Sequence, residues 1–267
     1  MDVARLSSRL WLWYVPAAIG CAAAGLFATG FWLALSRPVG QPVGSAPASV
    51  EAPIPRPAGA RLLLVLGDSL ARGTGDESGK GYALDVLQFL RKRGAADIAN
   101  LAINGVESGD VRDLLARENV RRLAASADLI LLSVGGNDLS HAVPRGSRSP
   151  VEALGDIGRT REGFAANLRE IFDRLRVSNP RAPVYVLGLY DPFGEGSAPG
   201  RAGASVILSW NTTLEETSLA YPGIFVVPTF DLFQGRADRL AVDRFHPNRR
   251  GYQAIAARVI QLLPDAL

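Results

Sequence analysis

The feature that most constrains the fold is a regular alternation, from Arg61 onward, of short apolar runs with amphipathic stretches. The apolar runs are Leu62–Leu66, Ile98–Ile103, Leu129–Val134, Val184–Leu189 and Ile224–Val227. The amphipathic stretches include Tyr82–Leu90, Thr160–Val177, Val206–Leu219 and Gly251–Leu263. Buried parallel strands are typically continuous apolar runs, and helices cover both faces of such a sheet. We therefore predict a three-layer α/β/α sandwich with a five-stranded parallel sheet over residues 61–267.

Polar residues with useful chemistry follow the ends of these predicted strands. The segments are Gly67-Asp68-Ser69-Leu70, Asn104-Gly105, Gly135-Gly136-Asn137-Asp138 and Tyr190–Gly194, with Asp243–Asn248 before the last helix. In open α/β sheets, ligands bind beyond the carboxyl ends of the strands. We therefore expect these segments to meet at one edge of the sheet.

Three of these residues predict nucleophilic catalysis. A serine hydroxyl becomes an effective nucleophile when a histidine takes its proton and a carboxylate orients that histidine. Asp243 and His246 are three residues apart, so the carboxylate can reach the imidazole of its own loop. With Ser69 they form a predicted triad in the order Ser, Asp, His. A tetrahedral oxyanion needs nearby donors, and Gly105 can supply a backbone N–H and Asn137 a side-chain amide.

Four ordered blocks give the sequence its family resemblance. They are GDSL at 67–70, the glycine at 105 within NLAINGVESGD, GGND at 135–138 and DRFHPN at 243–248. With these blocks the chain resembles the SGNH hydrolases, also called GDSL esterases and lipases, over nearly all of residues 61–267. The segments GDSLARGTGDESGKGY and GLYDPFG are most similar to bacterial lysophospholipase-like members.

The resemblance implies a flavodoxin-like α/β/α fold and a role for each matching residue. Ser69 would be the nucleophile, and His246 the base, oriented by Asp243. The backbone N–H groups of Ser69 and Gly105 and the amide of Asn137 would form the oxyanion hole.

Neighbouring residues are given less direct roles. We expect Asp68 to hold the turn through its side chain and Asp138 to support its own loop. His141 is either an ordinary loop residue or part of the pocket lining. The glycine-rich segment 73–81 is not a phosphate loop, because Thr74 and Gly81 stand where that motif requires glycine and Ser or Thr.

The N-terminal part predicts a membrane anchor followed by a tether. The 26 residues Leu10–Leu35 carry no charge, and about 20 apolar residues span a bilayer. Arg5 and Arg9 precede this run, which predicts that residues 1–36 form a cytoplasmic stub and one transmembrane helix, with the rest outside. Cleavage near Ser36 and lipidation at Cys21 are the alternatives. Residues 37–60 carry six prolines and predict an extended linker.

Composition narrows the cofactors and partners. The chain has one cysteine and two histidines, too few for a zinc site built on those residues, and we expect neither a metal nor a cofactor. The arginines are scattered rather than gathered in a basic stripe, so no nucleic-acid partner is expected. The expected partners are an ester substrate, of a small molecule, lipid or glycan, and the membrane itself.

These observations predict a membrane-tethered serine esterase of acylated lipid or envelope substrates, acting outside the cytoplasmic membrane. Two alternatives share the motifs or the tether. One is a deacetylase or acyltransferase of cell-envelope polysaccharide, which uses the same serine chemistry. The other is a catalytically silent binding module that recognises acylated glycan or lipid.

Overall fold

The computed structural model describes residues 59–142, 150–192 and 198–264. The predicted anchor at 1–36 lies outside these residues, as does the predicted linker at 37–60 except for its last two positions. Within the described ranges, no helix combines the length and the apolar character that crossing a bilayer requires.

The centre of the domain is a five-stranded sheet, as predicted. Its strands are β1 (Arg61–Gly67), β2 (Ala96–Asn100), β3 (Leu129–Ser133), β4 (Val184–Leu187) and β5 (Ile224–Val227). They lie in the order β2-β1-β3-β4-β5, and every neighbouring pair is parallel. Strand β1 therefore lies between β2 and β3, and the segments that follow these three strands emerge side by side.

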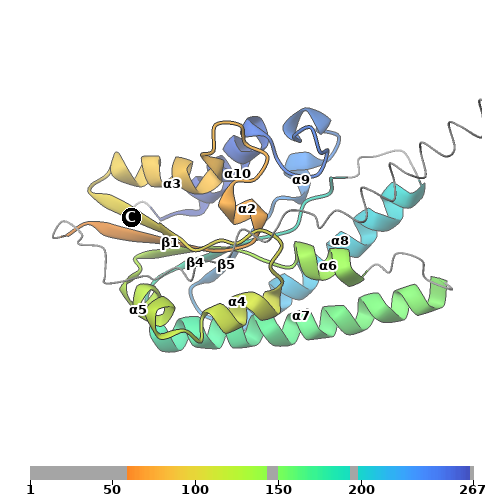
Figure 1. The fold of residues 1–267 in the computed structure, drawn as a ribbon, viewed down its shortest axis with the longest axis horizontal. Coiled ribbons are helices and arrows are strands. Elements are labelled where there is room, and N and C mark those ends of the chain that lie inside the picture. The colour runs from red at the N-terminus through yellow and green to blue at the C-terminus, as the bar shows by residue number, and fades with distance from the viewer. Residues whose placement is uncertain (1–58, 143–149, 193–197, 265–267) are drawn as a thin grey trace, which may run out of the picture. The chain divides into compact units, whose positions relative to one another are not determined.

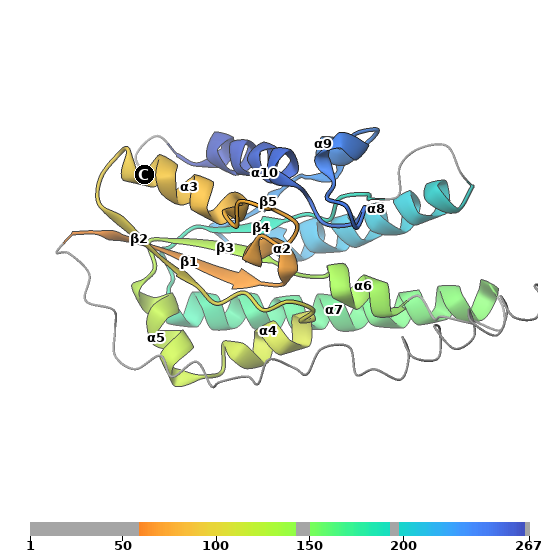
Figure 2. The same ribbon diagram turned by 45° about the horizontal axis from the view of Figure 1, so that its top comes forward.

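Two layers of helices cover the sheet (Figures 1 and 2). One layer contains α2 (Ser69–Arg72), α3 (Gly81–Arg91), α9 (Phe230–Phe233) and α10 (Arg249–Leu262). The other contains α4 (Ser108–Leu114), α5 (Glu118–Ser126), α7 (Pro150–Ser178) and α8 (Ala198–Leu219), and α6 (Gly136–Ala142) packs on α7. A short 3₁₀ helix, η1 (Ala237–Arg239), precedes α10.

Alternate residues of β1 supply the two hydrophobic cores. Leu62, Leu64 and Leu66 are buried in the core that α4, α5, α7 and α8 share. Leu63 and Val65 are buried in the core beneath α3 and α10. Successive side chains of a strand point to opposite faces of the sheet, so an uninterrupted apolar strand requires helices on both faces. This burial on both faces explains why the strands stand out in the sequence as continuous apolar runs.

The boundaries differ from the predicted ones in places. Backbone beyond β2 still donates to β1, from the N–H of Leu101 to the carbonyl of Val65 and from Ile103 to Gly67, at 2.9 and 2.8 Å. The predicted strand Ile98–Ile103 therefore follows the true path although β2 ends at Asn100. Helix α7 begins ten residues before the predicted Thr160, at Pro150. Helices α2, α4, α5, α6 and α9 were not among the predicted elements.

Candidate active site

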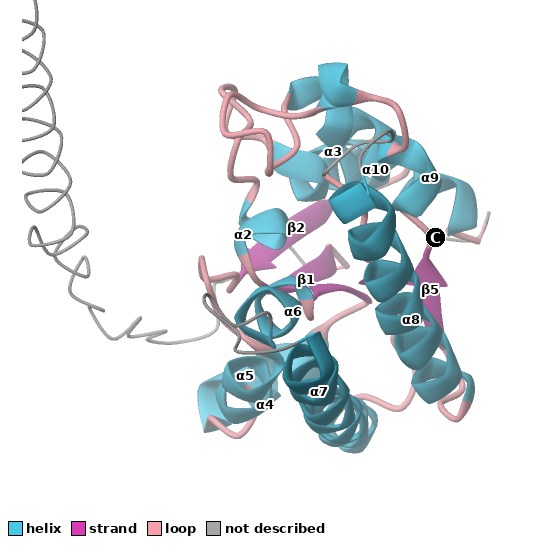
Figure 3. Ribbon diagram, turned by 90° about the vertical axis from the view of Figure 1, so that its right-hand side faces the viewer, coloured by secondary structure: helices cyan, strands magenta, loops and turns pink. Residues whose placement is uncertain are grey.

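The chain turns sharply where β1 ends, and this turn places Ser69. Gly67 has φ +126, and a Cβ at this position would lie 2.0 Å from the carbonyl oxygen of Ser133 on β3. Only glycine fits such a close approach of two backbones. Ser69 is the first residue of the short helix α2, which begins at the carboxyl edge of the sheet (Figure 3).

Asp68 holds this turn, as expected for a structural residue. Its Oδ1 accepts hydrogen bonds from the N–H of Leu70 at 3.0 Å and from the hydroxyl of Ser133 at 2.5 Å. The Ser133 hydroxyl oxygen in turn accepts from the N–H of Ala71 at 3.1 Å. Burial raises the pKa of the Asp68 carboxyl above 3.8, and these hydrogen bonds only partly oppose the rise.

A clamped loop presents Asp243 and His246. Leu240 and Pro247 form an antiparallel bridge, and the N–H of Ala241 donates to the carbonyl of His246 at 2.8 Å. The loop between them turns at Arg244, which has φ +55. The Asp243 carboxylate accepts from the N–H of His246 at 3.0 Å, so this carboxylate also shapes the loop that carries it.

Ser69, His246 and Asp243 form a continuous hydrogen-bonded chain. Nε2 of His246 lies 3.0 Å from Oγ of Ser69, and Nδ1 lies 2.6 Å from Oδ2 of Asp243. Partial burial would by itself raise the pKa of Asp243. The hydrogen bonds from the His246 ring and from the N–H groups of Phe245 and His246 outweigh burial and lower that pKa below 3.8. With a carboxylate at Nδ1, the neutral imidazole carries its proton there and leaves Nε2 free to accept one.

The loop after β2 and the first turn of α6, the helix that follows β3, hold the two predicted oxyanion donors. Gly105 has φ +79 and no atom within 4 Å of a Cβ built on it, so its backbone is open. The side-chain amide of Asn137 donates to the carbonyl of Val106 at 2.8 Å. One hydrogen of the amide thus fixes Asn137 to the loop of Gly105, and a second hydrogen remains on the same nitrogen.

Asp138 was predicted to support its own loop, and the structure gives it a supporting role of wider reach, since it lies on α6 and holds the start of α4. Its carboxylate accepts from the N–H of Ser108 at 3.0 Å and also from the Ser108 hydroxyl. The Ser108 hydroxyl accepts in turn from the Asn167 amide at 2.9 Å, and Arg112 donates to Asn167 at 2.9 Å. Ser108 and Asn167 were missed from the sequence, because a buried network that joins α4, α6 and α7 has no local signature.

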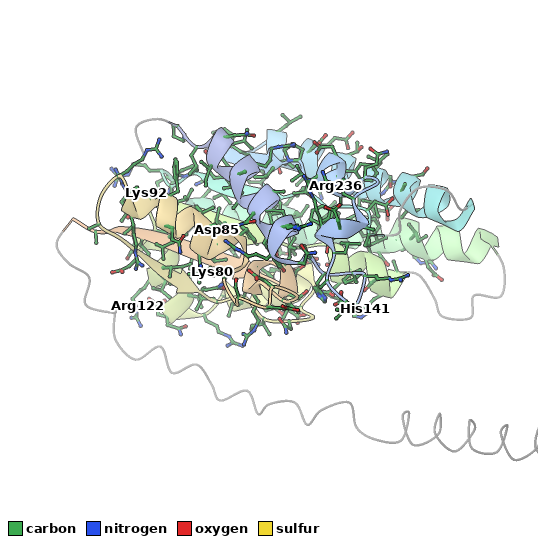
Figure 4. All side chains as sticks on the ribbon, turned by 90° about the horizontal axis from the view of Figure 1, so that it is seen from above. Lys80, Asp85, Lys92, Arg122, His141 and Arg236 are labelled. Atoms are coloured by element: carbon green, nitrogen blue, oxygen red, sulfur yellow. The ribbon has the colours of Figure 1, made fainter. Side chains whose placement is uncertain are left out.

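His141 pairs with Glu107 rather than joining the hydrogen-bonded chain of Ser69. It lies on α6 with its ring largely exposed (Figure 4), and Nδ1 contacts Oε1 of Glu107. Glu107 is two residues after Gly105. The pair is therefore a surface contact between α6 and the loop that carries one predicted oxyanion donor.

Two tyrosines, the half-buried Tyr190 and the fully buried Tyr252, and a glycine pack the loops against one another. The hydroxyl of Tyr190 donates to the carbonyl of Phe245 at 2.6 Å, and that of Tyr252 donates to the carbonyl of Thr74 at 2.7 Å. A Cβ on Gly75 would lie 2.8 Å from Cβ of His246. The glycine-rich segment is thus a direct support for the histidine loop. Tyr190 was expected at this edge of the sheet only as part of the segment Tyr190–Gly194, and Tyr252 only as part of the last amphipathic stretch. Neither was given a partner, because contacts with a backbone carbonyl require no particular residue type at the partner.

The described residues contain no group of three or more His, Cys, Asp or Glu side chains placed to hold a metal ion. The chemistry available at the sheet edge is that of a serine hydroxyl next to an imidazole with a carboxylate behind it. Such a set can form and break an acyl–oxygen bond by nucleophilic attack with general base assistance.

An α/β/α sandwich that carries a hydrogen-bonded Ser–His–Asp set at its carboxyl edge defines a class of enzyme, the serine hydrolases. Residues 65–254 match the GDSL-like Lipase/Acylhydrolase family. The chain belongs to this family and is an ester hydrolase of the GDSL type.

Similar proteins include lipases and carbohydrate esterases. The chain is 28% identical over 209 residues to the uncharacterized protein YpmR of Bacillus subtilis, covering 76% of this chain and 81% of the relative. It is 27% identical to the spore germination lipase LipC of Bacillus licheniformis, covering 73% and 92%. Among solved structures, the lipase Lip_vut3 from a goat rumen metagenome superposes with a TM-score of 0.68 at 23% identity, covering 76% and 97%. The acetylxylan esterase Axe2 of Geobacillus stearothermophilus superposes with a TM-score of 0.57 at 18% identity, covering 75% and 93%.

Proposed function

We propose that the chain hydrolyses carboxylic esters with Ser69 as nucleophile, His246 as general base and Asp243 as the residue that orients the imidazole. The observation that carries this proposal is the hydrogen-bonded chain, with 3.0 Å from Ser69 Oγ to His246 Nε2 and 2.6 Å from His246 Nδ1 to Asp243 Oδ2. The unbroken chain disfavours a catalytically silent binding module, because a module that only binds has no need of it.

The reaction runs in two halves. Ser69 Oγ attacks the ester carbonyl carbon while Nε2 of His246 takes the hydroxyl proton, and the carbonyl oxygen becomes an oxyanion. The N–H groups of Ser69 and Gly105 and the free amide hydrogen of Asn137 stabilise that oxyanion. The acyl–oxygen bond then breaks, and the leaving alcohol takes the proton from His246. Water repeats the same steps on the acyl-serine, which releases the acid and restores the hydroxyl.

The substrate class that we favour is an acylated lipid, with lysophospholipase-like or lipase-like activity. Support comes from the relative named as a lipase and from the uncharged run Leu10–Leu35, which would keep the enzyme at a membrane. A second candidate is a deacetylase or acyltransferase of envelope polysaccharide. It is favoured by the fold it shares with an acetylxylan esterase.

The location that we propose is the outer side of the cytoplasmic membrane, with residues 1–36 as a single-pass anchor and 37–60 as the tether. The support is the sequence alone: the uncharged run, and Arg5 and Arg9 before it. Protease added to spheroplasts of an expressing strain should degrade the hydrolase domain, with a cytoplasmic protein as the intact control. Protection of the domain until the membrane is opened would contradict this topology.

The experiment that tests the function is hydrolysis of a p-nitrophenyl ester series from acetate to palmitate by the full chain in mild detergent. The Ser69→Ala variant is the control, and a fluorophosphonate probe should label the wild type alone. Highest activity with long acyl chains supports the lipid substrate, and highest activity with acetate supports the deacetylase. Hydrolysis or labelling that survives in the Ser69→Ala variant would refute the assigned nucleophile.

A further inference from the structure

The loop that delivers Asp243 and His246 to Ser69 also exposes apolar side chains. We call residues Val242–Phe245 the tip. Val242 is 98% exposed and Phe245 42% exposed, although both are large apolar residues. The ring of Phe245 meets that of His246 edge-on, with centroids 5.1 Å apart. Exposed apolar surface thus begins directly beside the catalytic imidazole.

The geometry of the tip separates a catalytic inside from an apolar and basic outside. The carboxylate of Asp243 is directed back into the loop, where it accepts from the N–H of Phe245 at 2.9 Å and from the ring of His246 at 2.6 Å. Arg244 is exposed, and no carboxylate of the described residues forms an ion pair with it. Val242, Arg244 and Phe245 are therefore left to face the surroundings of the site.

Ile103 is a further exposed apolar residue near the turn that carries Ser69. It is 49% exposed, and its N–H donates to the carbonyl of Gly67, two residues before Ser69, at 2.8 Å. Other exposed apolar residues lie elsewhere. Val177 and Leu219, for example, lie at the ends of α7 and α8, just before β4 and β5 begin. Exposed apolar residues therefore occur both in the tip and in the loop after β2, next to the turn that carries Ser69.

We propose that the tip docks on the surface of a lipid bilayer, so that an acyl ester reaches Ser69 directly from the membrane. Val242 and Phe245 enter the boundary between headgroups and acyl chains, and Arg244 pairs with the phosphate of an anionic lipid. Apolar residues next to an unpaired basic one suit this interface, where one end of the surface is apolar and the other charged. This inference rests on the proposed esterase function and specifies its substrate as lipid in a bilayer.

The size of the tip favours a bilayer over a second copy of the chain. A stable protein interface needs about 20–30 residues on each side, whereas the tip has four residues. A bilayer demands no shape complementarity, and burial of one or two apolar side chains is enough to hold a loop that is already close to it. A run of uncharged residues such as Leu10–Leu35 would keep the tip close.

The first test measures where the tip lies. Cys21 is the single cysteine of the chain, so the full chain with Cys21→Ser and Val242→Cys accepts one nitrobenzoxadiazole label at the tip. The matched control carries Val177→Cys, since Val177 is 86% exposed and lies at the opposite edge of the sheet. Vesicles of phosphatidylcholine, with or without phosphatidylglycerol, contain a nitroxide-labelled lipid as quencher. We expect quenching at 242 but not at 177, and stronger quenching with phosphatidylglycerol.

A second test uses activity with two forms of ester. Val242→Ser should lower hydrolysis of a long-chain lysophospholipid in vesicles about tenfold, because the variant loses the burial of one valine. It should leave hydrolysis of water-soluble p-nitrophenyl acetate unchanged, and Val177→Ser should change neither. Arg244→Gln should remove the effect of phosphatidylglycerol and lower vesicle activity about fivefold on anionic vesicles.

The possible outcomes distinguish failure of the bilayer docking surface from failure of the proposed esterase function. Equal quenching at 242 and 177, or full vesicle activity in Val242→Ser, would overturn the docking surface while Ser69-dependent hydrolysis of the soluble ester upholds the esterase. If the emission of the label at 242 shifts to the blue without vesicles, and the shift grows with protein concentration, the tip would be assigned to a contact with a second copy of the chain instead. If no ester is hydrolysed, the esterase fails, and the quenching experiment still decides whether the tip enters a bilayer.

Discussion

At the scale of single residues, the two hydrogens of the Asn137 side-chain amide have different roles, one structural and one catalytic. One hydrogen goes to the carbonyl of Val106 at 2.8 Å, and the proposal gives the other to the oxyanion. The two roles have different costs. Loss of the structural hydrogen bond costs about 1 kcal/mol of stability, whereas loss of an oxyanion donor lowers turnover about 10²–10³-fold.

Asn137→Ala should therefore fold and bind substrate but lose most of its kcat. The measurement is steady-state hydrolysis of a short p-nitrophenyl ester together with urea unfolding. Ser140→Ala is the matched control, because the Ser140 hydroxyl donates to the backbone carbonyl of Asn137 at 3.0 Å and its loss disturbs the same turn without touching the amide. Near-normal kcat in Asn137→Ala would remove this residue from the oxyanion hole.

Asp68 predicts a pH dependence of stability. Burial raises its pKa above 3.8 in the folded state, so the folded protein binds this proton more tightly than the unfolded chain does. The stability that Asp68 contributes is complete below pH 3.8 and is lost as the pH rises through the folded pKa. An asparagine keeps an acceptor oxygen for Leu70 and Ser133 but does not titrate.

The Asp68→Asn variant should thus gain stability relative to the wild type between acidic and neutral pH, as measured by urea unfolding across that range. Asp231→Asn is a control for which we expect the opposite change of stability with pH. The hydrogen bond from Arg258 lowers the pKa of Asp231 below 3.8, and this variant should lose stability relative to the wild type as the pH rises. The same trend in both variants would contradict the assigned burial effect.

At the scale of elements, the glycine-rich segment after α2 supports the histidine loop by close contact. Gly75 has φ +93, and a Cβ there would lie 2.7 Å from the carbonyl oxygen of Pro247 and 2.8 Å from Cβ of His246. Gly79 has φ +67 but no atom within 4 Å of such a Cβ. An alanine at Gly79 would therefore show the effect of a left-handed backbone alone, whereas an alanine at Gly75 would add a steric clash with the histidine loop.

Gly75→Ala should move His246 away from Ser69 and lower kcat up to about 10²-fold, since a displacement of about 1 Å has that effect on aligned catalytic groups. Gly79→Ala has a similar backbone strain and should keep its activity. Kinetics with a short ester and thermal unfolding measure both variants. Equal activity in the two would show that the segment does not position the histidine.

The sequence was informative for some elements and silent for others, for physical reasons. Parallel strands buried on both faces are continuous apolar runs, so the five strands were predicted with small errors at their ends. Helix α5 was missed because it is short: its nine residues include only two buried positions, Val120 and Ala124, which lie one helical turn apart. The start of α7 was placed too late, because Gly155 and Gly158 lower helix propensity there.

At the scale of the whole molecule, Ser69 and His246 meet across 177 residues of sequence. Their meeting could be predicted because parallel strands bring their carboxyl ends to one edge. The contacts that support them could not, since the tyrosines and Ser108 bind partners far along the chain. Arg249 is the clearest example of a side chain that binds partners far away in the sequence. It donates to Asp85 on α3 at 2.6 Å and lies 3.4 Å from Asp76 in the glycine-rich segment.

Arg249 thus joins the start of α10 to two elements near the start of the domain. The Asp76 side chain is fully buried. Burial would raise its pKa, but hydrogen bonds from Ser78 and Gly81 and the charge of Arg249 lower it below 3.8. Its contribution to stability is therefore present above pH 3.8 and is lost as the pH falls through the folded pKa. Removal of the guanidinium would leave a buried carboxylate with hydrogen bonds and no opposite charge.

Arg249→Met should lower the free energy of unfolding by about 1–3 kcal/mol, less than for a fully buried pair because the Arg249 side chain is 30% exposed. The deficit should narrow in acid, where Asp76 becomes protonated. Arg250→Met is the matched control, since that side chain is 76% exposed and surface changes of this kind stay within about 0.5 kcal/mol. Urea unfolding at neutral and acidic pH gives both values. Equal free energies of unfolding for the two variants would mean that the contacts of Arg249 with Asp76 and Asp85 add no stability beyond that of the two hydrophobic cores.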